Sequence, residues 1–135
     1  MAFEGGLVND LSFTATSGTG ILSDHQFHAV KIAAAGVVAL STSSTGGTAR
    51  VVGILQNDPA SDEAATVRVL GYSKWECGEA VALNDALVSS SSGTAFVANT
   101  TGEYVVGWAA SATTAAGQIL TAYINPGYMF AGSTA

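Results

Sequence analysis

Residues 51–72, VVGILQNDPASDEAATVRVLGY, carry the clearest structural pattern in this chain. The stretch opens with the short β-branched run Val51 to Leu55 and closes with the alternating run Ala65 to Tyr72, and both patterns are typical of strands. The residues between them are rich in Asn, Asp, Ser and Pro, which form turns through a fixed φ or through side-chain bonds to the backbone. The stretch therefore predicts two strands joined by an acidic turn.

A looser copy of this pattern returns at Val105 to Asn125, where Val-Val-Gly again opens the first run. An earlier strand is expected from Gln26 to Ala34, and turn signals recur about every 8 to 12 residues, the spacing of an all-β sandwich or barrel. No segment carries the longer periodic pattern of a helix. We expect an all-β fold, a small single-domain barrel or sandwich of short antiparallel strands.

The first 24 residues differ from the rest, because large apolar residues alternate with Gly-Gly and Ser-Gly-Thr-Gly without any regular period. Polar disordered tails rarely carry so many large apolar groups. Two interpretations stay open for this segment: an extended arm that docks on a partner, or an edge strand of the same domain. The predicted division is an extended N-terminal arm at 1–24, a β-domain at 25–126 and a C-terminal tail at 127–135.

The charge of the chain limits its partners. Ten acidic and four basic residues give a net charge of −6, and the four cations are dispersed. Binding to nucleic acid or to an anionic membrane needs clustered cations, so neither partner is expected. Cys77 is the only cysteine, which rules out an intrachain disulfide. The N-terminus lacks the basic and apolar regions of a signal peptide, and we expect synthesis in a cytoplasm.

Candidate catalytic and metal-binding groups are few. His25 and His28 lie three residues apart, but a strand would direct them to opposite faces, and zinc needs three or four ligands at defined spacing. The Gly-x-Ser-x-Gly turn of a hydrolase is absent, and the acidic cluster in residues 58–63 lacks the alternation of a calcium loop. The sequence thus predicts no catalytic residues, no metal site and no cofactor.

The aromatic residues offer two interpretations. Trp75, Trp108, Tyr104 and Tyr123 could form a platform on which sugar rings stack, or could pack in the core or between subunits. Packing is the more frequent role of aromatic residues near strands that glycines interrupt. We therefore expect these side chains to contribute to contacts within or between copies of the chain.

With these residues laid out, the chain resembles the capsid cement (head decoration) proteins of tailed bacteriophages. The resemblance runs from about Phe27 to Pro126. Four pieces carry it in order: HAVKIAAAGVVAL, VVGILQNDPASDEAATVRVLGYSKWECG, AVALNDALV and VVGWAASATTAAGQILTAYINP. The chain departs from the family pattern at Asp58, which intervenes between Asn57 and Pro59, and at Asn84, where the family usually has glycine.

The resemblance implies a structural protein of the virion without enzymatic activity. Such a protein binds the outside of an assembled phage head and stabilises the capsid lattice, most often as a trimer, so its partners are the major capsid protein and copies of itself, with no small-molecule substrate. We expect the arm to contact the capsid through Phe3, Leu7 and Val8. Expected contributors to the subunit interface are Trp75, Trp108, Tyr123, Tyr128, Met129 and Phe130.

Two other classes stay open at this point. One is a receptor- or glycan-binding β-module on a virion or appendage, whose binding would depend on Trp75 or Trp108. The other is an enzyme accessory or a small β-barrel hydrolase, which would need serine, histidine and acid to converge in one site.

Overall fold

The computed structural model describes residues 8–42 and 50–129, and within these ranges it contains strands and no helix. The strands are β1 (Asn9–Ala15), β2 (Ala29–Ala34), β3 (Val37–Leu40), β4 (Gly53–Leu55), β5 (Ala64–Glu76), β6 (Ala86–Ser89), β7 (Ala95–Val97), β8 (Tyr104–Ala109) and β9 (Ile119–Met129). The predicted all-β class is confirmed. In these ranges no helix has the length and apolarity needed to cross a bilayer.

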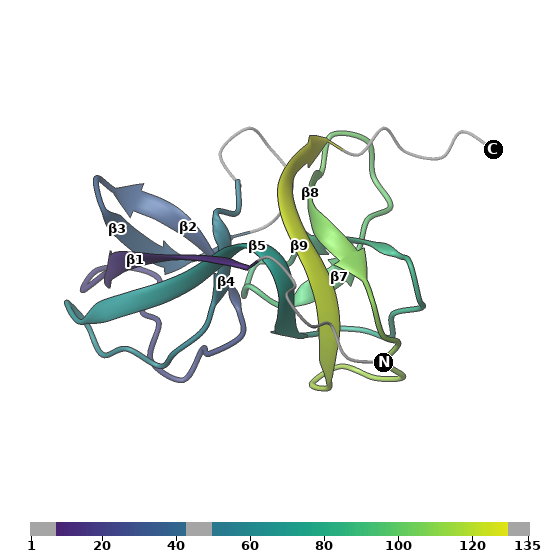
Figure 1. The fold of residues 1–135 in the computed structure, drawn as a ribbon, viewed down its shortest axis with the longest axis horizontal. Helices are drawn as coiled ribbons and strands as arrows, with labels where there is room; N and C mark the ends of the chain where they lie inside the picture. The colour runs from purple at the N-terminus through teal and green to yellow at the C-terminus, as the bar shows by residue number, and fades with distance from the viewer. Residues whose placement is uncertain (1–7, 43–49, 130–135) are drawn as a thin grey trace.

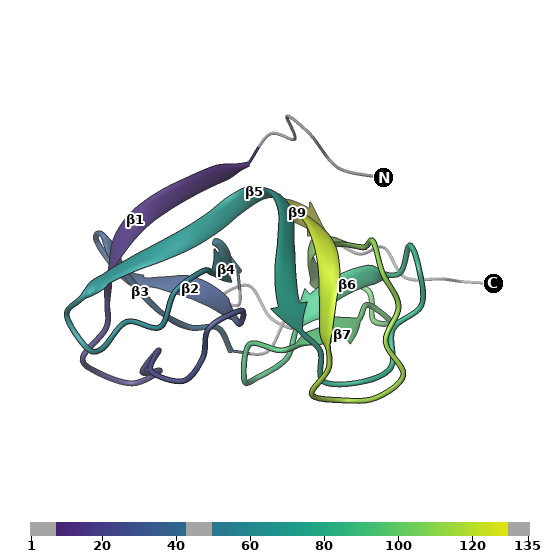
Figure 2. The same ribbon diagram turned by 60° about the horizontal axis from the view of Figure 1, so that its bottom comes forward.

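The long strand β5 organises the molecule into two lobes (Figure 1). Its first half completes a five-stranded barrel in the order β1-β3-β2-β4-β5, which closes because β1 also pairs with β5. Its second half opens the order β5-β9-β8-β6-β7, and a bridge from Cys77 to Ala95 brings β7 back to the end of β5. Gly71, with φ of +106°, lies where the pairing of β5 with β1 has ended and its pairing with β9 begins. Figure 2 shows that β5 bends between the two lobes.

In β5 and at Cys77, which follows it, odd-numbered side chains face the core, although Val69 is only half-buried where the register with β1 shifts. Ala65, Val67, Ser73, Trp75 and Cys77 are buried. The even-numbered side chains between them point outward and are exposed or half-buried. One core cluster joins the lobes, because residues of β2 and β4 pack in it together with residues of β5, β8 and β9. A second cluster fills the five-stranded barrel.

The repeated Val-Val-Gly has the same physical cause in both lobes. A Cβ at Gly53 would collide with the carbonyl oxygen of Arg68 on β5, and a Cβ at Gly107 would collide with that of Tyr123 on β9. At each place a neighbouring strand passes so close that only glycine fits. The repetition seen in the sequence therefore marks the two positions at which a strand crosses tightly over its neighbour.

Two element boundaries in the structure differ from those predicted from the sequence. The strand expected from Gln26 begins at Ala29, because Asp24 and Phe27 adopt positive φ (68° and 66°) and form a turn before it. Residues 9–15, placed in the predicted arm, form strand β1 of the domain, antiparallel to β5 over Asn9 to Thr14 and parallel to β3 at Thr14 and Ala15. These residues therefore belong to the sheet, with a paired strand on each side of β1 and no free edge as an edge strand would have. Phe3 and Leu7 lie outside the described residues.

Candidate functional site

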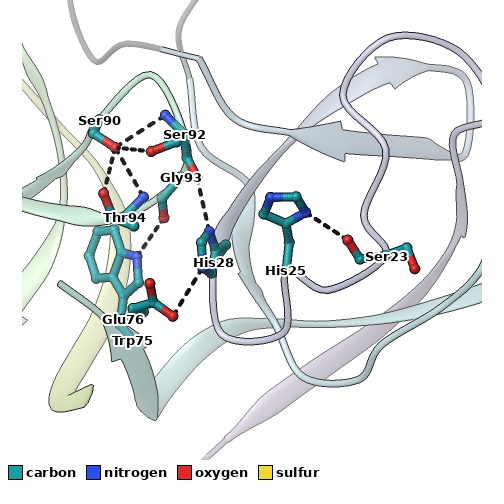
Figure 3. Close-up of polar contacts among 9 residues, drawn as sticks. All are labelled: Ser23, His25, His28, Trp75, Glu76, Ser90, Ser92, Gly93 and Thr94. Atoms are coloured by element: carbon teal, nitrogen blue, oxygen red, sulfur yellow. Dashed lines mark hydrogen bonds and ion pairs between the residues drawn. The ribbon is translucent and has the colours of Figure 1, made fainter. Parts of the chain in front are cut away.

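The two histidines lie close together, contrary to the expectation that a strand separates them. The turn before β2 brings the rings of His25 and His28 to a centroid separation of 5.0 Å, edge to face. His25 Nδ1 lies 2.9 Å from the carbonyl oxygen of Ser23. His28 is buried and contacts two other segments of the chain (Figure 3).

The partners of His28 determine what this cluster can do. Its Nδ1 lies 2.9 Å from the carbonyl oxygen of Ser92, which only accepts, so Nδ1 carries a hydrogen and donates it. Its Nε2 lies 3.4 Å from Oε1 of Glu76, and the two form an ion pair when the imidazole is doubly protonated. Through these two contacts His28 ties the turn before β2 to the β6–β7 loop and to the end of β5.

The loop beside His28 joins the two lobes. The carbonyl oxygen of Gly93 accepts hydrogen bonds from Trp75 Nε1 (2.9 Å) and from the backbone N–H of Ala29 (2.8 Å). Inside the loop, Ser90 Oγ accepts from the N–H groups of Ser92 and Thr94 at 3.2 and 3.1 Å (Figure 3). The histidine cluster is therefore a structural junction between β2, the end of β5 and the β6–β7 loop.

The outer face of the second lobe carries the strongest candidate for an interaction surface. Tyr72 on β5 pairs directly across the sheet with Tyr123 on β9, and Tyr123 pairs with Trp108 on β8. We call these three side chains the aromatic row. The rings of Tyr72 and Tyr123 lie 5.4 Å apart at 68°, and Tyr123 is 37% exposed while the other two are half-buried. Tyr and Trp in this setting are typical of protein contacts.

A charged pair fixes the strand next to this face. Arg68 on β5 donates from Nε to Oδ1 of Asp10 at 2.8 Å and from Nη2 to Oδ2 at 3.0 Å, and it donates from Nη1 to the carbonyl oxygen of Tyr72 at 2.9 Å. Hydrogen bonding to Asp10 raises the pKa of Arg68, with the carboxylate charge adding to the effect and partial burial opposing it. The guanidinium thus stays charged and holds the start of β1 against β5.

The predicted interface residues separate into two groups. Trp108 and Tyr123 come together in the aromatic row, with Tyr72, which the sequence analysis missed. Trp75 points to the opposite face of β5 and is fully buried, so it has no surface to offer a second copy, and its predicted interface role is replaced by a core role. The side chains of Tyr128 and Met129, and all of Phe130, lie outside what the structure describes. Val8 is 46% exposed just before β1.

Two remaining features carry no recognisable catalytic chemistry. A hollow of about 300 Å³ lies at the seam of the lobes, where Arg50 stacks over the ring of Tyr104 at 5.2 Å and valines line most of the wall. Cys77 is buried, with its Sγ 3.2 Å from Thr113 Oγ1 and 3.3 Å from the carbonyl oxygen of Ala115. The described residues bring no base to the thiol, so we assign it a packing role.

Comparisons with known proteins give one informative result. No family model and no curated protein matches the chain. Among solved structures, the chain is similar to the N base of the head fiber gp8.5 of bacteriophage phi29, with a TM-score of 0.63 and 16% sequence identity. The likeness covers 88% of this chain and 95% of that one. At this identity the likeness establishes a shared fold over nearly the whole of both chains.

Proposed function

We propose that this protein is a structural component of a tailed-bacteriophage virion that binds the outside of the assembled head and stabilises the capsid lattice. One observation carries the proposal: the fold is shared, over almost its full length, with the base of a phage head fiber. The resemblance of residues 27–126 to head decoration proteins rests on sequence patterns and not on the fold, and it also supports a position on the phage head. The proposal includes no catalytic activity, no cofactor and no small-molecule substrate.

Such a protein would stabilise the capsid lattice by mass action. A protein that binds the assembled lattice but not its separated subunits stabilises the lattice by RT ln(1 + [L]/Kd) per site, where [L] is the concentration of the free protein and Kd its dissociation constant for the lattice. Trimeric assembly would add avidity, since three weak contacts then act together. We infer that copies meet through the outer face of the second lobe, where Trp108 and Tyr123 lie, over about 800 Å² per partner.

Binding to heads is the direct test. Purified protein is mixed with expanded heads that lack it, with unexpanded heads and with free capsid protein, and each mixture is sedimented. We expect saturable cosedimentation with expanded heads only, together with a higher temperature of head disruption. Equal binding to free capsid protein, or none to any head, would refute the proposal. Light scattering on the unbound protein measures the oligomer, for which we expect the mass of a trimer.

The predicted capsid contact through Phe3, Leu7 and Val8 needs a deletion that spares the fold. Since β1 begins at Asn9 and closes the barrel, removal of residues beyond 8 would destroy a strand. The informative variant lacks residues 2–7 only. We expect it to remain folded and to bind expanded heads more weakly, and undiminished binding would show that the contact lies elsewhere.

A receptor- or glycan-binding module is the second candidate, because the partly exposed ring of Tyr123 beside Tyr72 and Trp108 suits the stacking of a sugar ring. This function would produce glycan binding that Tyr123→Ala or Trp108→Ala abolishes. Trp75 no longer serves as a test of it, because the indole is buried. Glycan binding without head binding would favour this candidate over the first.

A further inference from the structure

The hollow at the seam of the lobes offers no group for catalysis, but its shape and charge suit the recognition of another chain. It measures about 300 Å³, close to the lower limit of ligand pockets, whereas a cavity of about 150 Å³ already admits a benzene ring. It therefore has room for one large side chain and the group next to it. None of its described lining residues belongs to the aromatic row, so it is separate from the face through which we infer that copies meet.

The hollow lies where the strand ladders of both lobes are irregular. On β9, residues 125–127 correspond to Val106 alone on β8, because the register between the two strands shifts there. Pro126 has no N–H group to donate, and Gly127 adopts a φ of +129°, which favours glycine. On β5, the pairing with β1 skips Val69. The course of the strands themselves therefore forms the hollow.

The wall of the hollow is apolar, and part of it is left uncovered. Val52 and Val69 pack against the core of the barrel and are only half-buried. Tyr104 and Pro126 are half-buried as well. The valines that line the hollow come from both lobes: Val51, Val52, Val69, Val105 and Val106. Covering such a wall removes apolar area from water and therefore favours a partner that brings an apolar group.

Arg50 is the only charged residue among the described residues that line the hollow. Its Cζ lies 5.2 Å from the centroid of the Tyr104 ring, so the flat face of the guanidinium covers the ring. This stacking leaves the N–H groups in the guanidinium plane for an acceptor. The ion pairs between described residues involve His28 and Arg68, and no described carboxylate pairs with Arg50. An exposed cation without an acidic partner therefore lies beside an apolar hollow, in a chain of net charge −6.

We propose that the hollow binds a segment of a partner protein in which a large apolar side chain, such as that of leucine, lies next to a carboxylate. The side chain enters between the valines, and the carboxylate accepts hydrogen bonds from the in-plane N–H groups of Arg50. Charge complementarity selects this occupant, since an apolar group alone leaves the guanidinium without an acceptor and an anion alone leaves the valines in water. The inference rests on the proposed function for the identity of the partner, which is then the major capsid protein.

Three small compounds test this chemistry without any component of a phage. N-acetyl-L-leucine carries an apolar side chain and a carboxylate, N-acetyl-L-leucinamide lacks the carboxylate, and N-acetylglycine lacks the side chain. Each is titrated into nitrogen-15-labelled protein, where the amides of Val52, Val69 and Val106 report the hollow and the indole of the buried Trp75 reports the rest of the fold. We expect saturable shifts at the hollow with N-acetyl-L-leucine, and at least about fivefold weaker binding of the other two compounds.

Variants of the cation assign the effect to Arg50. Arg50→Gln should weaken the binding of N-acetyl-L-leucine about fivefold and leave that of N-acetyl-L-leucinamide unchanged, because only the first compound uses the charge. Arg50→Lys should restore part of the affinity. The matched control Lys31→Gln changes the net charge equally at a cation outside this hollow and should have no effect. An unchanged Trp75 signal shows that each variant is folded.

Head binding then tests the identity of the partner. In the cosedimentation assay, Arg50→Gln should bind expanded heads several-fold more weakly than the parent protein, and Lys31→Gln should bind them equally well. Absence of saturable shifts at the hollow, equal binding of the three compounds, or undiminished head binding by Arg50→Gln would overturn the proposal. If the parent protein binds no head while N-acetyl-L-leucine still binds at the hollow as expected, the function proposed above fails and the chemistry of the hollow is supported.

Discussion

Replacement of Trp75 by phenylalanine tests the central packing argument most directly. Its indole is fully buried in the cluster that joins the lobes and donates a hydrogen bond to the carbonyl oxygen of Gly93. Loss of the larger ring removes roughly 1–2 kcal/mol of packing, since truncation of a buried Trp to Ala costs about 3–5 kcal/mol. Loss of the hydrogen bond adds about 1 kcal/mol. The carbonyl keeps its bond from Ala29, so no unsatisfied acceptor increases the cost.

We therefore expect Trp75→Phe to lower the free energy of unfolding by about 2–3 kcal/mol. The matched control is Trp108→Phe, whose half-buried ring should cost about 1 kcal/mol or less. Urea unfolding at one fixed protein concentration measures both, and in each variant the remaining tryptophan serves as the fluorescent probe. Equal losses in the two variants, or a loss below about 1 kcal/mol for Trp75→Phe, would refute the assignment of Trp75 to the core.

The other predictions concern the tight crossings, the charged pair and the aromatic row. Gly53→Ala and Gly107→Ala should each lower thermal stability by about 2 kcal/mol or more because a Cβ meets a backbone carbonyl; Gly18→Ala, whose Cβ would meet only Thr16 Oγ1 at 3.6 Å, should stay within about 0.5 kcal/mol. If the alanine variants melt like the parent, the crossings are looser than described. Asp10→Asn should cost at most about 1 kcal/mol, because the pair is partly exposed, yet speed amide exchange in β1; unchanged exchange there would show that Arg68 does not hold this strand. Tyr123→Ala should leave the unfolding free energy within about 1 kcal/mol while it weakens self-association or head binding. The control Ile32→Ala, an exposed apolar change on β2 of the other lobe, should weaken neither; equal effects of the two would argue against the row as a contact surface.

The sequence predicted those features whose causes are local. The two strands around the acidic turn were readable from residues 51–72 because alternation and turn chemistry act over a few residues. The same alternation, followed without a break from Ala65 to Cys77, would have placed Trp75 on the core side with Val67. It would also have placed Tyr72 on the outer face, so the signal for the aromatic row was present in the parity of one strand.

The features that the sequence did not predict depend on distant pairing or on unusual dihedral angles. β1 is exposed along most of its length, and its strand character comes from β5, whose paired residues lie fifty or more positions away in the chain. The contact of His25 with His28 requires positive φ at Asp24 and Phe27, which residue type alone does not demand of a phenylalanine. Closure of the first barrel likewise follows from a non-local pairing that no short pattern encodes.

The strand β5, which runs through both lobes, also determines how rigidly the lobes are connected. Because β5 contributes backbone to each lobe, tension applied to one is transmitted through a covalent chain and two sets of cross-strand bonds. A rotation of one lobe against the other would have to disrupt the core cluster that they share and the hydrogen bonds to the carbonyl oxygen of Gly93. The two lobes should therefore move as one rigid body, so a contact that anchors one lobe also fixes the orientation of the other.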